Sequence, residues 1–483
     1  MRNVRMGLSI VGAALLASAR ILVAGAPEAD ANAPAITGPI TGGEHGRPFT
    51  ATLDDLAKAG YREDEFFLEG QARTFAPQPG TSLGPDGNWK IVPGAPQGYK
   101  TRILVRRPVD PHRFNGTVVV EWMQATAGFD KDVNWNWQDA EFLRDGYAWV
   151  GVSAQRQGVD GSPPSPKNIF MDLTRWDPAR YGSLHIPSEE LSYDIYSQVG
   201  RAVGAVRPRG PVDPMGGLKV EKVLAIGDTF AADHLVTYYD AVQPSAHAFD
   251  GFFIGWRHVS GATPLTAGAP LPDIVRLRTD VAAPVFVVNT TAEVVPHFPA
   301  RQPDSDRYRL WEIAGGAHTN AYWIPKMYAI MKRDFAMPVP VCARPFDTVP
   351  NQYVMNAAIA RLNRWVRGAG APPVLPPVTV AGSPPAIVLD AFGNSAGGAR
   401  LPELTVPIAR YGAASDPACP GGSGYTDAFP SAELRSLYPD QKDYVAKYAA
   451  ADAAVKAGYL LPVDAKAAVR NAEQMPPLIG ADR

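Results

Sequence analysis

Three residue types that together can hydrolyse an ester follow strand-like segments of the sequence. Thr229 stands in the turn of "KVLAIGDTFAADHL", Glu293 follows "APVFVVNT", and His318 lies in the loop of "RLWEIAGGAHTNAYW". A histidine can accept the proton of a hydroxyl while its oxygen attacks a carbonyl carbon, and a carboxylate can orient that histidine. The order nucleophile, acid, histidine is one in which such groups occur along a chain. These positions predict a catalytic triad.

The turn around Thr229 has the residue sizes that a sharp strand-to-helix turn requires. Gly227 and Ala231 stand two residues before and two residues after it. Both must be small because the turn brings them against neighbouring backbone. Asp228 is an alternative nucleophile, but a turn centred there would place larger residues at the crowded positions. The other interpretation of this segment is a strand end followed by an ordinary Asp or Thr helix cap.

The same turn predicts where an oxyanion would be stabilised. Hydrolases that use such a turn bind the oxyanion with the backbone N–H after the nucleophile and a second N–H from the loop after an earlier strand. The first donor is expected to be Phe230, and the second is expected in the loop after "VVVEW", at Met123 or Gln124, with Gln124 as the assigned residue.

Threonine is an uncommon residue for the position of Thr229. The turn requires a positive φ, which is unfavourable for a β-branched residue, and the stiff χ1 of threonine can aim the hydroxyl away from the histidine. Two functions therefore stay open. The chain is either an ester hydrolase with a threonine nucleophile, or a catalytically impaired relative that binds a small ligand in the same cleft.

The residues that would carry this chemistry require a parallel sheet to position them. Short apolar runs rich in β-branched and aromatic residues alternate with segments compatible with helices, which predicts an α/β fold with strands buried on both faces. The expected strands are "YREDEFFLEGQARTF", "YKTRILVRRP", "GTVVVEW", "YAWVGVSAQ", "KVLAIGD", "FDGFFIGW", "APVFVVNT" and "YRLWEIAG". We expect one mainly parallel central sheet with helices on both faces.

The sequence predicts one core domain, which contains an insertion and is followed by a C-terminal extension. A core is expected over residues 40–370, with a Gly/Pro-rich connection at 77–98 and a cap-like insertion at 161–217 before the strand that leads to Thr229. Residues 371–483 are expected to form a C-terminal extension packed on the core. This extension includes "QKDYVAKYAAADAAVKAG", which the sequence predicts as one helix.

The N-terminus has the layout of a secretory signal peptide. Two arginines precede an apolar run, and small residues such as Ala24, Gly25 and Ala26 follow it. Cleavage near residue 26 would give a periplasmic or secreted protein without a stable membrane anchor. An uncleaved anchor is the alternative. The two cysteines, Cys342 and Cys419, could form a disulfide in such a compartment or remain inert buried thiols.

Composition excludes several classes of partner. The chain has 46 Lys and Arg against 48 Asp and Glu, a net charge of -2, so no global field would attract nucleic acid or an anionic membrane. Two cysteines outside a C-x-x-C pair do not make a structural zinc site. We expect a small, neutral ester as the substrate, and no metal or cofactor.

Long segments of the chain resemble one family. "FNGTVVVEW", "DPARYGSLHIP", "SYDIYSQVGRAV", "RQPDSDRYRLWEIAGGAHTNAYW" and "DAFGNSAGGARLP" are similar to the bacterial α/β hydrolase domain-containing proteins, whose nucleophile turn lies near G-x-S-Q-S-A. The resemblance covers most of the mature chain. It implies an α/β-hydrolase fold, with the nucleophile at Thr229, the histidine at His318 and the acid at Glu293 in Thr290-Thr291-Ala292-Glu293.

The chain departs from the family pattern at the nucleophile turn. Threonine replaces serine, and Phe230 and Ala231 stand where the family has Gln and Ser. The resemblance therefore implies the fold directly, whereas the departures bear on activity.

Overall fold

The computed structural model describes residues 33–161, 171–207, 210–257, 259–414, 419 and 422–476. They fall within one compact unit, Asn32–Arg483. The predicted signal peptide, 1–26, lies outside the described residues, as do 162–170 and 208–209 of the predicted insertion. Within the described ranges, no helix is both long enough and apolar enough to cross a membrane.

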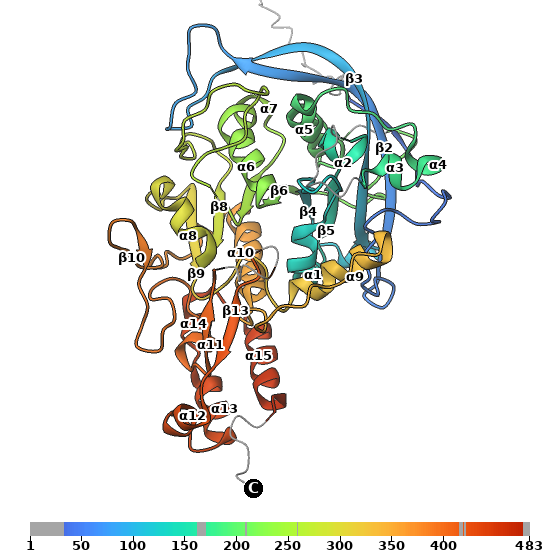
Figure 1. The fold of residues 1–483 in the computed structure, drawn as a ribbon. Coiled ribbons are helices and arrows are strands. Elements are labelled where there is room, and N and C mark those ends of the chain that lie inside the picture. Colours follow the sequence, from blue (N-terminus) through green and yellow to red (C-terminus); the bar gives the residue numbers. More distant parts are fainter. Residues whose placement is uncertain are drawn as a thin grey trace, which may run out of the picture. The chain divides into compact units, whose positions relative to one another are not determined.

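A sheet forms the centre of this unit (Figure 1), and it contains nine strands. Its order is β1 (Ala35–Thr37), β2 (Tyr61–Pro77), β3 (Ile91–Pro108), β5 (Ala148–Val152), β4 (Thr117–Trp122), β6 (Lys222–Asp228), β7 (Gly251–Gly255), β8 (Val285–Thr290) and β9 (Tyr308–Ile313). The pairs from β5 to β9 are parallel, and β1, β2 and β3 are antiparallel additions. The predicted fold class, an α/β-hydrolase fold with a mainly parallel sheet, is confirmed.

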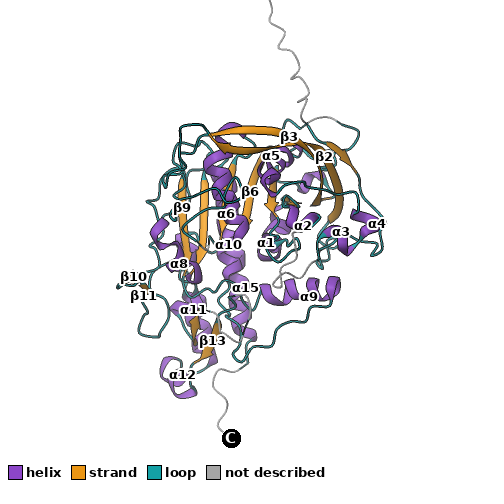
Figure 2. Cartoon of the chain, turned by 45° about the horizontal axis from the view of Figure 1, so that its top comes forward, coloured by secondary structure: helices purple, strands orange, loops and turns teal. Residues whose placement is uncertain are grey.

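Both faces of the parallel strands are buried, which explains their continuous apolar sequences. Val119 of β4 packs in the cluster that includes α1 (Val133–Asp145) and α10 (Asn351–Trp365), whereas Val118 and Val120 pack in the cluster of α5 (Ser192–Ala202) and α6 (Phe230–Thr237). Successive residues alternate between the faces because a strand has a side-chain period of two. The helices therefore form a layer on each side of the sheet (Figure 2).

The antiparallel edge differs from the predicted Gly/Pro-rich connection at 77–98. Strands β2 and β3 form a long hairpin that pairs as far as Pro77 with Ile91, so residues 91–98 belong to a strand. Only residues 103–106 of β3 also pair with β5. The prolines at 93 and 96 are tolerated because this part of β3 has a single pairing partner and its other edge is open.

The insertion before β6 is only partly a separate feature. Its described residues include the short helices α3 (Leu173–Trp176) and α4 (Pro178–Tyr181), followed by α5. Helix α5 belongs to the layer that covers the sheet, and the Tyr196 hydroxyl donates to the Val120 carbonyl oxygen at 2.7 Å. Because the apolar residues of α5 pack against the sheet, this part of the predicted insertion belongs to the core and not to a cap.

The C-terminal residues contact the core through polar and backbone bonds. Asp464 accepts from Arg144 of α1 at 3.0 Å and from Asn356 of α10 at 3.1 Å. Ala399 forms a parallel bridge with Ile313, next to the last strand of the sheet. The helix predicted over 441–458 is divided into α13 (Gln441–Ala450) and α14 (Ala453–Ala457), with residues 451 and 452 between them.

The remaining elements are short or lie near the C-terminus. They are α2 (Arg156–Val159), α7 (Gln243–Ala246), α8 (Thr291–His297), α9 (Trp323–Phe335), α11 (Pro402–Thr405), α12 (Ser431–Leu437), α13 (Gln441–Ala450), α14 (Ala453–Ala457) and α15 (Pro462–Gln474), the hairpins β10 (Val380–Ala381) with β11 (Ala386–Ile387) and β12 (Ala409–Gly412) with β13 (Tyr425–Ala428), and the single turns Pro111–Arg113, Glu189–Leu191, Tyr238–Val242 and Phe298–Ala300.

Candidate functional site

Thr229 occupies a strained turn between β6 and α6. Its backbone has φ 55° and ψ -120°, a conformation that β-branched residues rarely adopt. A Cβ added to Gly227 would lie 3.1 Å from the carbonyl carbon and oxygen of Ala231, so the turn brings these two residues together as the sequence predicts. Holding a threonine in this conformation costs about 1–3 kcal/mol. The surrounding fold therefore imposes the geometry of a nucleophile turn on Thr229.

Glu293 and His318 are in direct contact. The Nδ1 atom of His318 lies 2.7 Å from Oε1 of Glu293. The second oxygen of this carboxylate accepts from the Thr290 backbone N–H at 3.1 Å, in the capping box that begins α8. The carboxylate is thus fixed by the helix start on one side and holds the histidine ring on the other. This leaves Nε2 as the ring nitrogen that can exchange a proton with a nucleophile.

The backbone around His318 is held from three directions. Trp256 Nε1 donates to the His318 carbonyl oxygen at 2.6 Å, and the Thr319 N–H donates to the Gly422 carbonyl oxygen at 3.1 Å. The Ala317 N–H donates to the Asp347 carboxylate at 2.8 Å. The histidine loop is therefore positioned by three separate parts of the chain: the loop after β7, the segment before α10, and the C-terminal region.

The Thr229 hydroxyl has a partner that the sequence analysis did not anticipate. Gln124 Nε2 donates to Thr229 Oγ1 at 3.2 Å. Within the described residues, no hydrogen bond joins Thr229 to His318, so the nucleophile–histidine bond expected of a triad is not formed in this structure. Because a threonine has few favourable χ1 angles, the direction of this hydroxyl is set by the turn and by Gln124 together.

The predicted backbone donor at Gln124 is wrong. The Gln124 N–H donates to the Lys131 carbonyl oxygen at 3.1 Å, and the preceding Met123 N–H donates to the Val152 carbonyl oxygen at 3.2 Å. The loop folds back on itself in an antiparallel bridge between Gln124 and Lys131, which consumes this donor. The other predicted donor, Phe230, is the first residue of α6 and directly follows Thr229.

The fold agrees with a comparison against protein families. The sequence profile of the alpha/beta hydrolase domain family matches residues 36–470. The chain belongs to this family. In this chain, Thr229, Glu293 and His318 follow β6, β8 and β9. They therefore lie at the carboxyl ends of parallel strands in the same part of the sheet.

Comparisons with individual proteins give more distant matches. No curated protein matches the chain. Similar solved structures include esterase Est22, which is 10% identical with a TM-score of 0.33 and coverage of 66% of this chain and 84% of that chain. Glucuronoyl esterase from Solibacter usitatus is 9% identical, with a TM-score of 0.31 and coverage of 62% and 89%. Carboxylesterase Cest-2923 from Lactobacillus plantarum WCFS1 is 11% identical, with a TM-score of 0.27 and coverage of 46% and 80%.

A second histidine close to the turn of this hydrolase has a structural role. His234 lies within α6, and its Nδ1 is 2.8 Å from the Phe230 carbonyl oxygen. Its ring packs against Trp122 at a centroid distance of 4.9 Å. Burial lowers the pKa of His234 to about 4, so the ring is neutral at physiological pH. Its proximity in sequence to Thr229 therefore does not make it a competing base.

Asp228, the alternative nucleophile, is buried behind the turn. Neither of its carboxyl oxygens has a hydrogen-bond partner among the described residues. Burial raises the pKa of Asp228 well above its ordinary value of 3.8, and the nearby Glu293 and Glu121 raise it further. Burial therefore favours the neutral form of this carboxyl group, which makes it poorly suited to act as an anionic nucleophile.

Asp228→Asn is expected to make stability less sensitive to rising pH. Because the folded pKa lies above the unfolded value, the carboxyl group contributes most to stability below about pH 4, and this contribution is lost as pH rises toward the folded pKa. Asparagine has a similar shape and does not ionise. Urea unfolding of both proteins from pH 5 to pH 9 measures the effect. An identical loss of unfolding free energy in both proteins would contradict it.

The two cysteines, whose state the sequence leaves open, form a disulfide that spans 77 residues of sequence. Each half lies close in sequence to a segment that holds the histidine loop. Cys342 precedes Asp347, and Cys419 precedes Gly422. The Asp347 N–H also donates to the Ser423 carbonyl oxygen at 3.3 Å, which joins the two segments directly. The disulfide therefore fastens together the two segments that contact the residues on either side of His318.

Replacing both cysteines by alanine is expected to lower stability by about 2–4 kcal/mol, because the unfolded chain regains the freedom of a long loop. We also expect the rate of any reaction that uses His318 to fall about tenfold or more, because misplacing a catalytic group by 1 Å can cost about a hundredfold. Urea unfolding and ester hydrolysis with and without a thiol reductant measure both effects. The double variant, which should not respond to the reductant, is the control, and an unresponsive parent would contradict the expectation.

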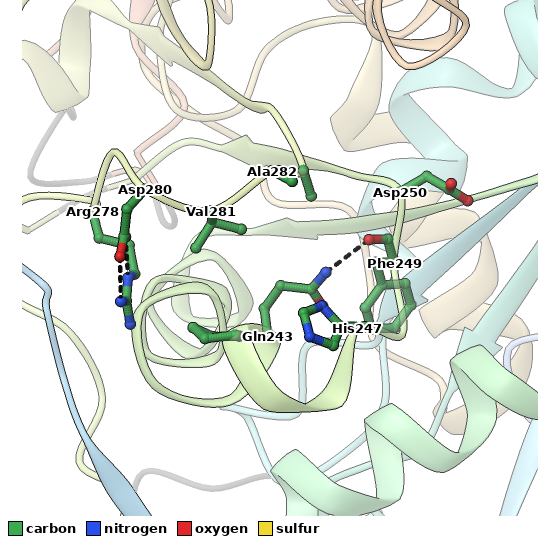
Figure 3. Close-up of a pocket in the computed structure, with 10 residues that line it drawn as sticks. Gln243, His247, Phe249, Asp250, Arg278, Asp280, Val281 and Ala282 are labelled. Carbon is green, nitrogen blue, oxygen red and sulfur yellow. Dashed lines mark hydrogen bonds and ion pairs between the residues drawn. The ribbon is translucent and has the colours of Figure 1, made fainter.

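One described cavity lies away from these residues. A cavity of about 550 Å³ is lined by residues that precede β7 and β8, including Gln243, Phe249, Arg278 and Asp280. Figure 3 shows the Gln243 amide bonded to the Phe249 carbonyl oxygen and Arg278 paired with Asp280. This cavity opens at the amino ends of the strands, whereas Thr229, Glu293 and His318 follow the carboxyl ends, so it is not part of the candidate active site.

Proposed function

We propose that this α/β hydrolase cleaves carboxylic esters, with Thr229 as the nucleophile, His318 as the general base and Glu293 as the residue that orients the histidine. The observation that carries the proposal is the combination of a threonine at φ 55° after β6 and a histidine whose Nδ1 contacts a carboxylate. Thr50 also has a positive φ, of 57°, but Thr229 is the threonine that combines this conformation with a position at the carboxyl end of β6, as a nucleophile turn requires. Strain of this kind concentrates at functional sites.

In the proposed reaction, His318 Nε2 takes the proton of the Thr229 hydroxyl as Oγ1 bonds to the carbonyl carbon. The tetrahedral intermediate collapses when the C–O bond to the alcohol breaks, and His318 returns the proton to the leaving oxygen. Water then attacks the acyl-threonine ester by the same proton transfers, which releases the acid and restores the hydroxyl. Glu293 stabilises the imidazolium that forms in each half of the cycle.

A second function is favoured by a specific observation. The Thr229 hydroxyl is bonded to Gln124 and not to His318 among the described residues, and threonine carries a methyl group that serine lacks. If this geometry persists when a ligand is bound, attack on a carbonyl is prevented. The chain would then be a hydrolase-fold protein that binds a small ligand in the same cleft without turnover.

The proposal includes the compartment and the substrate class. We infer export to the periplasm or outside the cell from the signal-peptide layout of residues 1–26, and the Cys342–Cys419 disulfide supports an oxidising compartment. Cleavage would leave no stable membrane anchor. The near-balance of charges, with a net of -2, favours a small neutral ester over a polyanionic substrate.

The experiment that separates the two functions measures turnover and binding on one preparation of the mature protein. Hydrolysis of p-nitrophenyl acetate is followed to many turnovers per protein molecule, and binding of 4-nitroanisole, an ether that cannot be hydrolysed, is followed by calorimetry. Repeated turnover above the protein-free rate supports the esterase. Saturable binding of the ether with no turnover of the ester would replace it with the binding protein.

A further inference from the structure

The side chain of Gln124 is fixed at the nucleophile by its own backbone. Gln124 and Lys131 exchange two backbone hydrogen bonds, at 3.1 Å and 3.0 Å, and the Met123 N–H is tied to β5 through Val152 at 3.2 Å. These bonds hold the residue directly after the end of β4. The residue is only 7% exposed, and its Nε2 donates to Thr229 Oγ1 at 3.2 Å. The amide is therefore a preorganised donor aimed at the reacting oxygen.

The loop after β4 has few hydrogen-bond donors that are available to an oxyanion, and the Gln124 side chain is one of them. A tetrahedral intermediate needs donors at the oxygen on which negative charge develops, and the backbone N–H groups of Met123 and Gln124 are already bonded elsewhere. The Gln124 side chain is the donor of this loop that contacts the nucleophile. In the intermediate, the oxyanion and Oγ1 are attached to the same carbon atom. A donor placed beside Oγ1 thus lies beside the position of the oxyanion.

We propose that the side-chain amide of Gln124 is a catalytic oxyanion donor. This inference rests on the proposed esterase function. In the free enzyme, Nε2 bonds to the Thr229 hydroxyl oxygen. When that oxygen becomes part of the ester, Nε2 transfers its bond to the developing oxyanion. The bond is stronger in the transition state because the acceptor has become charged, so it lowers the barrier and not only the binding free energy.

The same arrangement explains the burial of an otherwise costly amide. Gln124 Oε1 is buried and has no hydrogen-bond partner among the described residues, an arrangement that destabilises the folded protein. A glutamine used only to fill space would be better replaced by an apolar residue of the same size. Retaining the amide at this position is consistent with a use for its N–H donor.

The test compares Gln124→Met and Gln124→Glu with the parent in p-nitrophenyl acetate hydrolysis. Methionine has about the volume of glutamine but has no N–H donor. Glutamate has the shape of glutamine, but its carboxylate oxygens accept hydrogen bonds and cannot donate them. We expect kcat to fall about 100-fold to 1000-fold in each variant while KM changes by less than about threefold, because the lost interaction forms in the transition state. Inhibition by trifluoroacetophenone, which forms a tetrahedral adduct with a nucleophile, should weaken in parallel with kcat/KM.

Gln243→Met is the matched control. Gln243 is also a buried glutamine with its Nε2 bonded, to the Phe249 carbonyl oxygen at 2.8 Å, and with Oε1 lacking a partner, but it lies at the opposite ends of the strands. Its replacement should leave kcat at the parent value. Thermal unfolding of all variants confirms that each is folded, and Gln124→Glu, which is isosteric, provides the test if Gln124→Met unfolds.

The possible results separate this inference from the proposed function. An active parent whose Gln124 variants keep the parental kcat, or lose only binding through a higher KM, would overturn the role of Gln124 and leave the esterase in place. A parent without turnover would overturn both. A fall in kcat and in trifluoroacetophenone affinity in the Gln124 variants, with an unchanged Gln243 variant, is the result that the inference requires.

Discussion

Thr229→Ala is expected to lower kcat for p-nitrophenyl acetate at least about a thousandfold, to the residual rate that oxyanion donors and binding can support alone. Alanine removes the oxygen that forms the acyl intermediate. It keeps a Cβ atom, so we expect the turn to hold the same backbone conformation. The measurement is steady-state hydrolysis by parent and variant, with thermal unfolding to show that both are folded. If alanine supports the parental rate, Thr229 is not the nucleophile.

Thr229→Ser is the informative companion to the alanine variant. Serine keeps the hydroxyl but loses the methyl group that strains a residue at φ 55° and that limits its χ1 angles. We expect serine to turn over about 10-fold to 100-fold faster than threonine, because a better aimed hydroxyl removes a misplacement that can cost about a hundredfold. A parent that is inactive and becomes active only as serine would instead identify the natural protein as the non-catalytic binding protein.

His318→Asn is expected to reduce kcat by about ten-thousandfold, because no other group in this arrangement takes the proton from Thr229. Glu293→Gln should reduce it by about 1000-fold, since the amide can no longer stabilise the imidazolium or fix the ring with Nδ1 protonated. The amide oxygen can still accept from the Thr290 N–H, so the start of α8 should survive. Hydrolysis rates across pH 5–9 measure both variants.

Thr290→Val provides the control for the pair. Valine has the size of threonine but removes the hydroxyl of the capping box, so it weakens the helix start by about 1 kcal/mol. It also removes the hydrogen bond that this hydroxyl donates to Glu293 Oε2, while the Thr290 N–H still holds the same oxygen. Its effect on kcat should be far smaller than that of Glu293→Gln. If the three variants reduce kcat equally, the Glu293 effect reflects the helix start and the orienting role is wrong.

Much of the fold could be predicted because local patterns and tertiary structure agree. The apolar runs that contain Val119 and Leu224 became neighbouring parallel strands, and the small residues Gly227 and Ala231 became close neighbours across the turn. The order of Glu293 and His318 after apolar strands predicts that they act together. In the structure, His318 Nδ1 lies 2.7 Å from Glu293 Oε1. Parallel strands bring their carboxyl ends to one edge, so residue order alone can assemble part of a site.

Other features depended on contacts that a sequence pattern does not contain. The Gln124 N–H is consumed by Lys131, seven residues later, in a loop with no regular periodicity. The direction of the Thr229 hydroxyl is set by a side chain from another strand end. The pairing of Cys342 with Cys419 depends on where the C-terminal segment returns to the histidine loop. Each of these contacts involves irregular segments, where hydrophobic pattern and turn chemistry carry little information.

Covalent labelling tests most directly whether Thr229 is an activated nucleophile. The mature protein is incubated with a fluorophosphonate, digested, and mapped by mass spectrometry. We expect one phosphonyl group on the peptide that contains Thr229, with labelling absent in Thr229→Ala and strongly slowed in His318→Asn. Ester hydrolysis that continues while Thr229 remains unlabelled, or labelling that persists on another residue in Thr229→Ala, would contradict it.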